Sequence, residues 1–366
     1  MRDFIPVAEP WLGEKELAYA TECVRTSWIS SIGAFVSRFE EEFARFCGTK
    51  FAVSTSNGTT ALHLALRILD IGEGDEVIVP SLTFASSAFA VSYTGAVPVF
   101  AEVDQATWNI DPTLIEGRIS SRTKAIMLVH LYGHPVDIDP FLEIAHERNL
   151  KVIEDAAEAH GARYKGRRVG GLADVGCFSF YGNKIITTGE GGMLTLNSEA
   201  LAEKARFFRD VAMSPDKRYW HTDIGYNYRL TNLQAAIGVA QLEKIEEIIG
   251  KKRRNAEAYR TLLTDVEGIT LSPEASWAES VFWMYSVLIE DDFGMDRDSV
   301  MEALSKKGID TRPFFYPLHT LPPYKTGERF PVAEDLASRG INLPSGVTLS
   351  EEEIGYIVNS LRSLKK

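Results

Sequence analysis

The sequence predicts an α/β protein with a mainly parallel sheet, covered by helices on both faces, and a smaller α+β domain at the C-terminus. Short apolar runs rich in Val and Ile alternate with helical patterns through the first two thirds of the chain. The runs are unbroken, as is typical of strands buried on both faces. Because a single core rarely grows beyond about 300 residues, the 366 residues predict two domains. We expect them at residues 1–245 and 246–366.

The expected strands of the first domain are the apolar runs at 51–54, 76–79, 97–100, 125–130, 151–154, 176–180 and 193–196. Helical patterns lie between several of them, at 60–69, where Leu62, Leu66 and Leu69 share one side, and at 140–148. In such sheets ligands bind at the carboxyl ends of the strands. The residues that follow these runs are therefore candidates for a site.

The last third of the chain has a different pattern. A helical period begins at a cap on Thr231 or Asn232 and continues to about residue 263. A strand is expected at 282–289, and helices at 298–307 and 351–364. This succession predicts the small α+β domain.

Composition excludes several classes of protein. The 51 acidic residues outnumber the 39 basic ones, for a net charge of −12, which argues against nucleic acid as a partner. The three cysteines are far apart and show no CxxC spacing, so neither a disulfide framework nor a zinc knuckle is expected. No apolar run approaches the roughly 18 residues that a membrane helix needs, and no signal peptide is seen. We expect a cytoplasmic protein without a membrane partner.

The first candidate ligand site is the turn STSNGTTAL at residues 54–62. It leads from a strand into a helix, whose first turn offers free amides and a positive dipole, and Gly58 lets a ligand approach the backbone. A phosphate would fit there. On this segment alone, a helix cap that binds nothing is the favoured alternative. The turn is neither a Walker loop nor a GxGxxG fingerprint.

The second candidate is Asp155, which falls where an apolar strand ends, with Glu158 and His160 just beyond it. A carboxylate in a cleft can hold a protonated heteroaromatic nitrogen. The alternative is a loop aspartate that caps the next turn.

The third candidate is Lys184, in a turn between two apolar strands and ahead of the glycines of GEGG at 189–192. Apolar surroundings disfavour an ammonium and make the amine nucleophilic. The alternatives are a solvated surface lysine and a plain tight hairpin.

The order of these three features is more informative than any one of them. A phosphate-binding helix start, a strand-end carboxylate and a loop lysine are the three anchors that pyridoxal phosphate requires: a cradle for its phosphate, a partner for its ring nitrogen and an amine for its aldehyde. Together they predict this cofactor.

Several segments carry a resemblance to a known family: SNGT at 56–59, EDAA at 154–157, FSF at 178–180, GEGG at 189–192 and GYNYR at 225–229. Through them the chain resembles, over essentially its whole length, the DegT/DnrJ/EryC1/StrS family of pyridoxal-phosphate sugar aminotransferases. The resemblance implies the type I fold of pyridoxal-phosphate transferases, as in aspartate aminotransferase. It also implies a transaminase that acts on a nucleotide-linked sugar.

The resemblance assigns roles to single residues. Lys184 falls on the Schiff-base lysine and Asp155 on the partner of the pyridine nitrogen. Glu158 stands where many members have a glutamine beside the phenolic oxygen of the cofactor, and two anionic oxygens there would repel unless they shared a proton. Phe84 matches the aromatic residue that stacks on the cofactor ring.

The remaining cofactor contacts implied by the resemblance concern the phosphate. Gly58, Thr59 and Ser179 match its ligands in the same chain. Asn227 matches a ligand delivered by the partner subunit, which implies a homodimer with a shared active site.

Shorter segments indicate the substrate: WISS at 28–31, YWH at 219–221 and TRPFFYPLH at 311–319. They resemble members that transfer the amino group of L-glutamate to C4 of GDP-4-keto-6-deoxy-D-mannose. Ser31, Arg312, Tyr316 and His319 are the implied substrate contacts, although each reads equally well as a surface loop residue. The alternatives are a dTDP- or UDP-linked 3- or 4-ketosugar, or a regulator that binds cofactor or sugar nucleotide without catalysis.

Two further features of the sequence concern the reaction type and the expected absence of a metal site. Related sugar 3-dehydratases carry a histidine in place of the lysine, so Lys184 favours transamination. His130 and His134 are four residues apart, but Gly133 and Pro135 preclude the helix of a zinc motif, and no metal site is expected.

Overall fold

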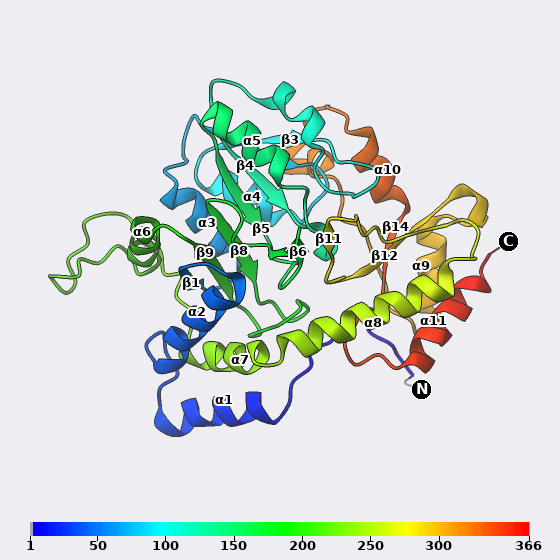
Figure 1. Ribbon diagram of the computed structural model, residues 1–366, viewed down its shortest axis with the longest axis horizontal. Helices are drawn as coiled ribbons and strands as arrows, with labels where there is room; N and C mark the ends of the chain where they lie inside the picture. The colour runs from blue at the N-terminus through cyan, green and yellow to red at the C-terminus, as the bar shows by residue number, and fades with distance from the viewer. Residues whose placement is uncertain (1–2, 366) are drawn as a thin grey trace.

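The structure is a computed structural model that describes residues 3–365 (Figure 1). Its centre is a seven-stranded sheet in the order β1-β9-β8-β5-β4-β2-β3. The strands are Phe51–Thr55 (β1), Glu76–Pro80 (β2), Val97–Ala101 (β3), Thr123–Val129 (β4), Lys151–Asp155 (β5), Val175–Ser179 (β8) and Gly192–Leu196 (β9). All pairs from β8 to β3 are parallel, and β9 is antiparallel to both β1 and β8. The expected mainly parallel sheet is confirmed.

Helices cover this sheet on both faces. Every residue of β2, β8 and β9 is buried, and because successive side chains point to opposite faces, both faces must be covered. α3 packs on β8 and β9, α5 on β4 and β5, α4 on β3, and α2 and α6 both pack on β1. These helices are Ala34–Cys47 (α2), Gly58–Ile68 (α3), Ser86–Tyr93 (α4), Asp139–Arg148 (α5) and Glu199–Arg209 (α6).

The C-terminal part holds an antiparallel sheet in the order β10-β12-β14-β13, on the right of Figure 1. Its strands are Ile269–Leu271 (β10), Tyr285–Ile289 (β12), Arg312–Pro313 (β13) and Gly340–Leu343 (β14). The helices Arg297–Ser305 (α9), Pro331–Arg339 (α10) and Glu351–Arg362 (α11) pack around it. A stacked pair of tyrosine rings, Tyr259 and Tyr285, lies in its core with centroids 4.8 Å apart.

A small three-stranded sheet connects the two parts. Strand Ala278–Glu279 (β11), from the C-terminal part, pairs with Arg163–Tyr164 (β6), which in turn pairs with Arg167–Arg168 (β7). The pairing holds the chain that follows β11 against the end of the main sheet. There Val281 donates its N–H to the carbonyl of Gly133 at 3.1 Å.

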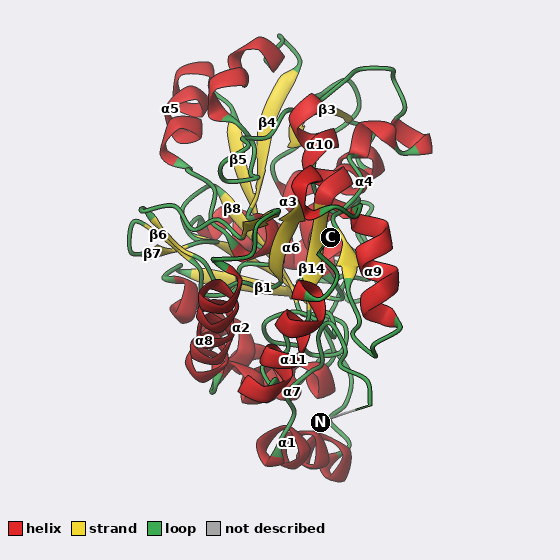
Figure 2. Cartoon of the chain, turned by 90° about the vertical axis from the view of Figure 1, so that its right-hand side faces the viewer, coloured by secondary structure: helices red, strands yellow, loops and turns green. Residues whose placement is uncertain are grey.

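The helix expected from residue 231 to 263 is two helices, Asn232–Leu242 (α7) and Ile245–Leu263 (α8). Thr231 caps α7, as expected. The break falls at Glu243 and Lys244, whose side chains bind the N-terminal region: Lys15 Nζ lies 2.6 Å from Glu243, and Lys244 Nζ lies 2.7 Å from Glu16. These contacts bring helix Glu14–Thr26 (α1) against α7, at the end of the molecule opposite α5 (Figure 2).

The division of the chain into domains at residue 245 stays a prediction. α8 enters both hydrophobic cores: Ile245 and Ile248 lie in the core of the main sheet, and Ala256, Tyr259 and Leu263 lie in that of the C-terminal sheet. No helix within residues 3–365 is both long enough and apolar enough to cross a membrane.

Candidate active site

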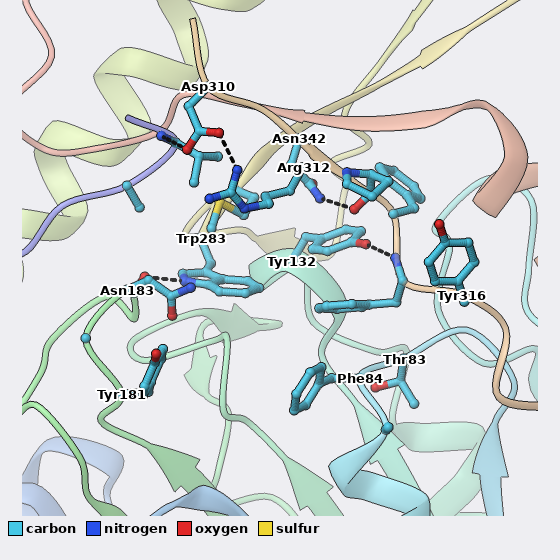
Figure 3. A pocket seen from close by; sticks show the side chains of 18 of the residues that line it. Thr83, Phe84, Tyr132, Tyr181, Asn183, Trp283, Asp310, Arg312, Tyr316 and Asn342 are labelled. Carbon is cyan, nitrogen blue, oxygen red and sulfur yellow. Dashed lines mark hydrogen bonds and ion pairs between the residues drawn. The ribbon is translucent and has the colours of Figure 1, made fainter. Parts of the chain in front are cut away.

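Two adjoining cavities open beside the carboxyl ends of the parallel strands. The smaller, about 390 Å³, is called here the lysine cavity because Lys184 lines it. The larger, about 760 Å³, is called the aromatic cavity because Trp283, Tyr132 and Phe315 form its walls (Figure 3). The predicted residues that line the lysine cavity are Gly58, Thr59, Phe84, Asp155, Glu158, Ser179 and Lys184.

One wall of the lysine cavity is the first turn of α3. Asn57 caps this helix by accepting the N–H of Thr60 on Oδ1 at 2.9 Å. Gly58 packs closely against the end of β8: a Cβ on Gly58 would lie 2.7 Å from Cβ of Ser179. The hydroxyls of Thr59 and Ser86 lie 2.8 Å apart beside it. The turn therefore offers amides, hydroxyls and a positive helix end, the groups that bind a phosphate.

Asp155 is the last residue of β5, and its side chain is buried at the cavity wall. Ser87 Oγ donates a hydrogen bond to Oδ2 at 2.8 Å, and the N–H of Ala157 donates to Oδ1 at 3.2 Å. Burial nevertheless raises the pKa of Asp155, because these donors offset only part of the desolvation. A protonated ring nitrogen against this carboxylate would supply the missing charge.

Lys184 lies in the loop between β8 and β9, with its Nζ 3.6 Å from Oε1 of Glu158. The N–H of Tyr132 donates to the other oxygen of Glu158 at 2.8 Å. Burial raises the pKa of Glu158 to about 7 and lowers the pKa of Lys184. Burial thus disfavours the charged form of both groups, and their proximity allows a proton to pass between them, as a lysine that acts as base and nucleophile requires.

Phe84 stands where the two cavities meet and is 56% exposed. Its ring is tilted at 57° to that of Phe315, with centroids 5.6 Å apart. A large aromatic face left open to a cavity is typical of a surface that a ligand covers. This position fits a ring that stacks on a flat heterocycle.

The aromatic cavity receives two of the predicted substrate residues, Arg312 and Tyr316 (Figure 3). Arg312 forms an ion pair with Asp310, and the N–H of Val7 donates to the same carboxylate at 3.2 Å. Tyr132 and Phe315 stack within the wall at 5.3 Å. The cavity thus combines apolar surface with one exposed guanidinium, a combination that suits a ligand with an anionic group and a flat ring.

Three predicted residues line neither cavity. His319 is buried, with Nδ1 2.7 Å from Ser81 Oγ and Nε2 3.0 Å from Glu334, so it ties its loop to the end of β2. Ser31 lies in the loop between α1 and α2. Asn227 is exposed and accepts a hydrogen bond from Arg229 at 2.9 Å. The roles predicted for these residues stay predictions.

Sequence reasoning missed Tyr132, Asn183 and Trp283, all of which line the site. Trp283 falls inside an expected strand, where an apolar residue reads as core. Tyr132 lies in the turn after β4 with a φ of 52°, a conformation that no sequence signal marks. Only the position of Asn183 next to Lys184 was a usable signal.

The residues present fit pyridoxal phosphate. The first turn of α3 and Ser179 would hold its phosphate, Asp155 its ring nitrogen and Phe84 one face of its ring. Lys184 would supply the amine. Gly58 is required for this packing, because a Cβ at this position would clash with Ser179. No group of three or more His, Cys, Asp or Glu side chains between residues 3 and 365 is arranged to hold a metal ion.

Comparison with known proteins agrees with this geometry. The model of the DegT/DnrJ/EryC1/StrS aminotransferase family matches residues 10–362. GDP-perosamine synthase of Caulobacter vibrioides is 48% identical over 98% of this chain and 97% of its own, and that of Escherichia coli O157:H7 is 46% identical over 98% of each. The crystal structure of the aminotransferase TlmJ from Streptoalloteichus hindustanus superposes with a TM-score of 0.94 at 33% identity, covering 99% of this chain and 98% of that one. The chain belongs to the DegT/DnrJ/EryC1/StrS aminotransferase family, and the predicted fold class and enzyme class are confirmed.

Proposed function

We propose that this enzyme uses pyridoxal phosphate to move the amino group of L-glutamate to C4 of GDP-4-keto-6-deoxy-D-mannose, which forms GDP-perosamine. The single observation that carries the reaction type is Lys184, whose amine lies 3.6 Å from Glu158 in a cavity that Asp155 and the first turn of α3 also line. The near-complete overlap with two GDP-perosamine synthases supports the choice of substrate.

The lysine cavity divides the work of transamination among its side chains. When bound, pyridoxal phosphate supplies an electrophilic carbon and a ring that accepts an electron pair. Asp155 holds a proton at the ring nitrogen. Lys184 moves a proton between the substrate carbon and the cofactor. Glu158, 3.6 Å from its amine, holds or releases a proton as the amine changes charge.

In this proposal the aromatic cavity binds the nucleotide sugar. Arg312 and Tyr316, which line it, would contact the nucleotide sugar through its diphosphate and hydroxyls. Two successive substrates share one cofactor, so L-glutamate leaves as 2-oxoglutarate before the ketosugar receives the nitrogen.

The working unit in this proposal is a homodimer. Asn227 is exposed on the loop between α6 and α7, which extends far from the rest of the chain in Figure 1. The same loop exposes Tyr219, Trp220 and Ile224, at 75%, 54% and 81%. Apolar side chains exposed together favour a protein interface, and a phosphate ligand from a second subunit would complete the site. We also propose a cytoplasmic location, which fits three free, buried cysteines.

The decisive experiment compares acceptors. Purified protein reconstituted with pyridoxal phosphate is given L-glutamate and either GDP-4-keto-6-deoxymannose or the dTDP-linked 4-keto-6-deoxyglucose, and the 2-oxoglutarate released is measured. We expect a higher kcat/KM with the GDP sugar. A preference for the dTDP sugar would overturn the proposed substrate, and no turnover with any UDP-, dTDP- or GDP-linked ketosugar would favour a regulator.

A further inference from the structure

Trp283 has no assigned role, yet its indole ring lies against the amine of Lys184. Nζ lies 3.8 Å from the ring centroid, within the range of a cation–π contact. The indole is 5% exposed and borders both cavities. It therefore lies at the point where the amine must meet cofactor and substrate.

A hydrogen bond fixes the indole ring relative to the lysine loop. Its Nε1–H donates to the carbonyl of Asn183 at 2.7 Å, and Asn183 immediately precedes Lys184 (Figure 3). The edge of the indole is thus bound to the backbone of the lysine loop, and its face lies against the lysine amine. Tyr132 stacks on the indole at 6.4 Å and 22°, which limits its movement.

The backbone of Trp283 is held by a hydrogen bond from helix α8. Lys252, buried on α8, donates from Nζ to the carbonyl of Trp283 at 2.6 Å and to that of Ser345 at 2.8 Å. On the other side, Gly133 allows the close approach of this segment, since a Cβ there would lie 2.8 Å from the N atom of Trp283. These contacts fix both the ring and the backbone of Trp283 beside Lys184.

We propose that Trp283 is a positioning residue that holds the free amine of Lys184 as an ammonium and aims it at the boundary of the two cavities. The ring face attracts the cation but accepts no proton, so the ammonium can still give its proton to a neighbouring base and become the nucleophilic amine. The inference rests on the proposed role of Lys184 but not on the identity of the sugar.

Other charges also act on this amine. Glu158 faces it at 3.6 Å, and the Asp155 carboxylate lies further off in the same cavity. His160 comes from the segment after Asp155 and is neutral, because burial lowers its pKa to about 3. None of these groups changes when the indole alone is replaced.

The test measures the pKa of Lys184 in cofactor-free protein. Acetylation by acetic anhydride is followed against pH, and the Lys184 peptide is quantified by mass spectrometry. Trp283→Leu keeps the site apolar but removes the ring, and we expect the pKa to fall by about half a unit to one and a half units. Trp283→Phe, with a weaker ring, should produce a smaller fall.

Trp277→Leu is the matched control, because this tryptophan packs on His134 and Tyr164 and lines neither cavity. It should leave the pKa of Lys184 unchanged.

If the indole of Trp283 acted only by excluding water, its loss would raise the pKa of Lys184. A rise or no change in the Trp283 variants overturns the proposal. If Trp283→Leu fails to fold, as judged by circular dichroism, Trp283→Phe decides the question alone. Because no sugar or cofactor is present, failure of the proposed reaction leaves this result interpretable.

Discussion

The lysine cavity and the aromatic cavity share a wall but are built in different ways. The first is formed mostly by segments near the strand ends of the main sheet, and its carboxylates Asp155 and Glu158 are buried and accept hydrogen bonds. The second is assembled from the N-terminal segment, the lysine loop and the C-terminal part, and its one guanidinium is 56% exposed on the side chain. We therefore expect the chemistry common to the family to depend on the lysine cavity, and the choice of substrate to depend on the aromatic cavity.

This contrast predicts that variants in the lysine cavity impair both halves of transamination, whereas variants in the aromatic cavity impair only the half that uses the sugar. The two halves are separable in the laboratory, because the glutamate half-reaction needs no sugar.

The largest effect is expected for Lys184→Arg. The guanidinium keeps the charge but is neither a nucleophile nor a base at neutral pH, so amine transfer should fall by at least about a thousandfold. Treatment with borohydride and pyridoxal phosphate, followed by mass spectrometry, should find no reduced cofactor adduct at this position. Lys204→Arg, on α6 and bonded to Asp70, is the control. An adduct still formed within the cavity of the Lys184 variant would contradict the assignment.

Asp155→Asn should rank second. The amide keeps the volume and can still accept from Ser87 but loses the charge, and leaving a buried partner charge unpaired costs about 2–5 kcal/mol, or roughly 30- to 5,000-fold in rate. Both half-reactions should slow together, as measured by single-turnover absorbance. Asp139→Asn, partly exposed on α5, tests the loss of an ordinary carboxylate. If only the half-reaction with the sugar slowed, the prediction that Asp155 acts in both half-reactions would be wrong.

Arg312→Gln should have a smaller and one-sided effect. A hydrogen bond to a charged group contributes about 1.5–3 kcal/mol, and the exposure of Arg312 reduces this, so we expect KM for the nucleotide sugar to rise by about tenfold. The glutamate half-reaction should keep its rate. Arg329→Gln, whose exposed side chain pairs with Glu334, serves as the control. Equal slowing of both halves would show that the two cavities are not functionally separate.

The same division explains what the sequence could predict. Asp155 ends β5, and Gly58 and Lys184 lie in the turns that follow β1 and β8, so a local pattern of apolar run and turn places them, and the order of strands brings them together. The seven strands of the main sheet were all expected, and no observed bound differs from the expected one by more than two residues.

Residues of the aromatic cavity lack such local signals. Trp283 reaches Lys184 only because β11 pairs with β6 and Gly133 admits its backbone. The same holds for His319, which lines neither cavity: it carries a loop-like sequence, yet its side chain is buried between Ser81 and Glu334. Contacts between distant segments depend on tertiary packing, which periodicity does not encode.

The smallest predicted effect concerns Glu158→Gln and the pH dependence of stability. Burial raises the pKa of Glu158 from 4.5 to about 7, so between these values the folded protein retains a proton that the unfolded chain has released. Stability from this group is fully present below pH 4.5 and is lost as the pH rises through 7. Glutamine has no such proton to lose. In cofactor-free protein, the variant should therefore gain about 1–3 kcal/mol relative to the wild type between pH 4.5 and 8.

Urea unfolding at several pH values measures this gain, with Glu279→Gln as the control because that carboxylate is exposed. A difference between Glu158→Gln and wild type that stays flat with pH would mean that Glu158 is ionised throughout, held so by Lys184 at 3.6 Å. The proton would then already lie on the lysine, and the carboxylate could not supply one during the exchange. A difference that rises with pH instead identifies Glu158 as a proton reservoir of the lysine cavity, the role that a glutamine at this position cannot perform.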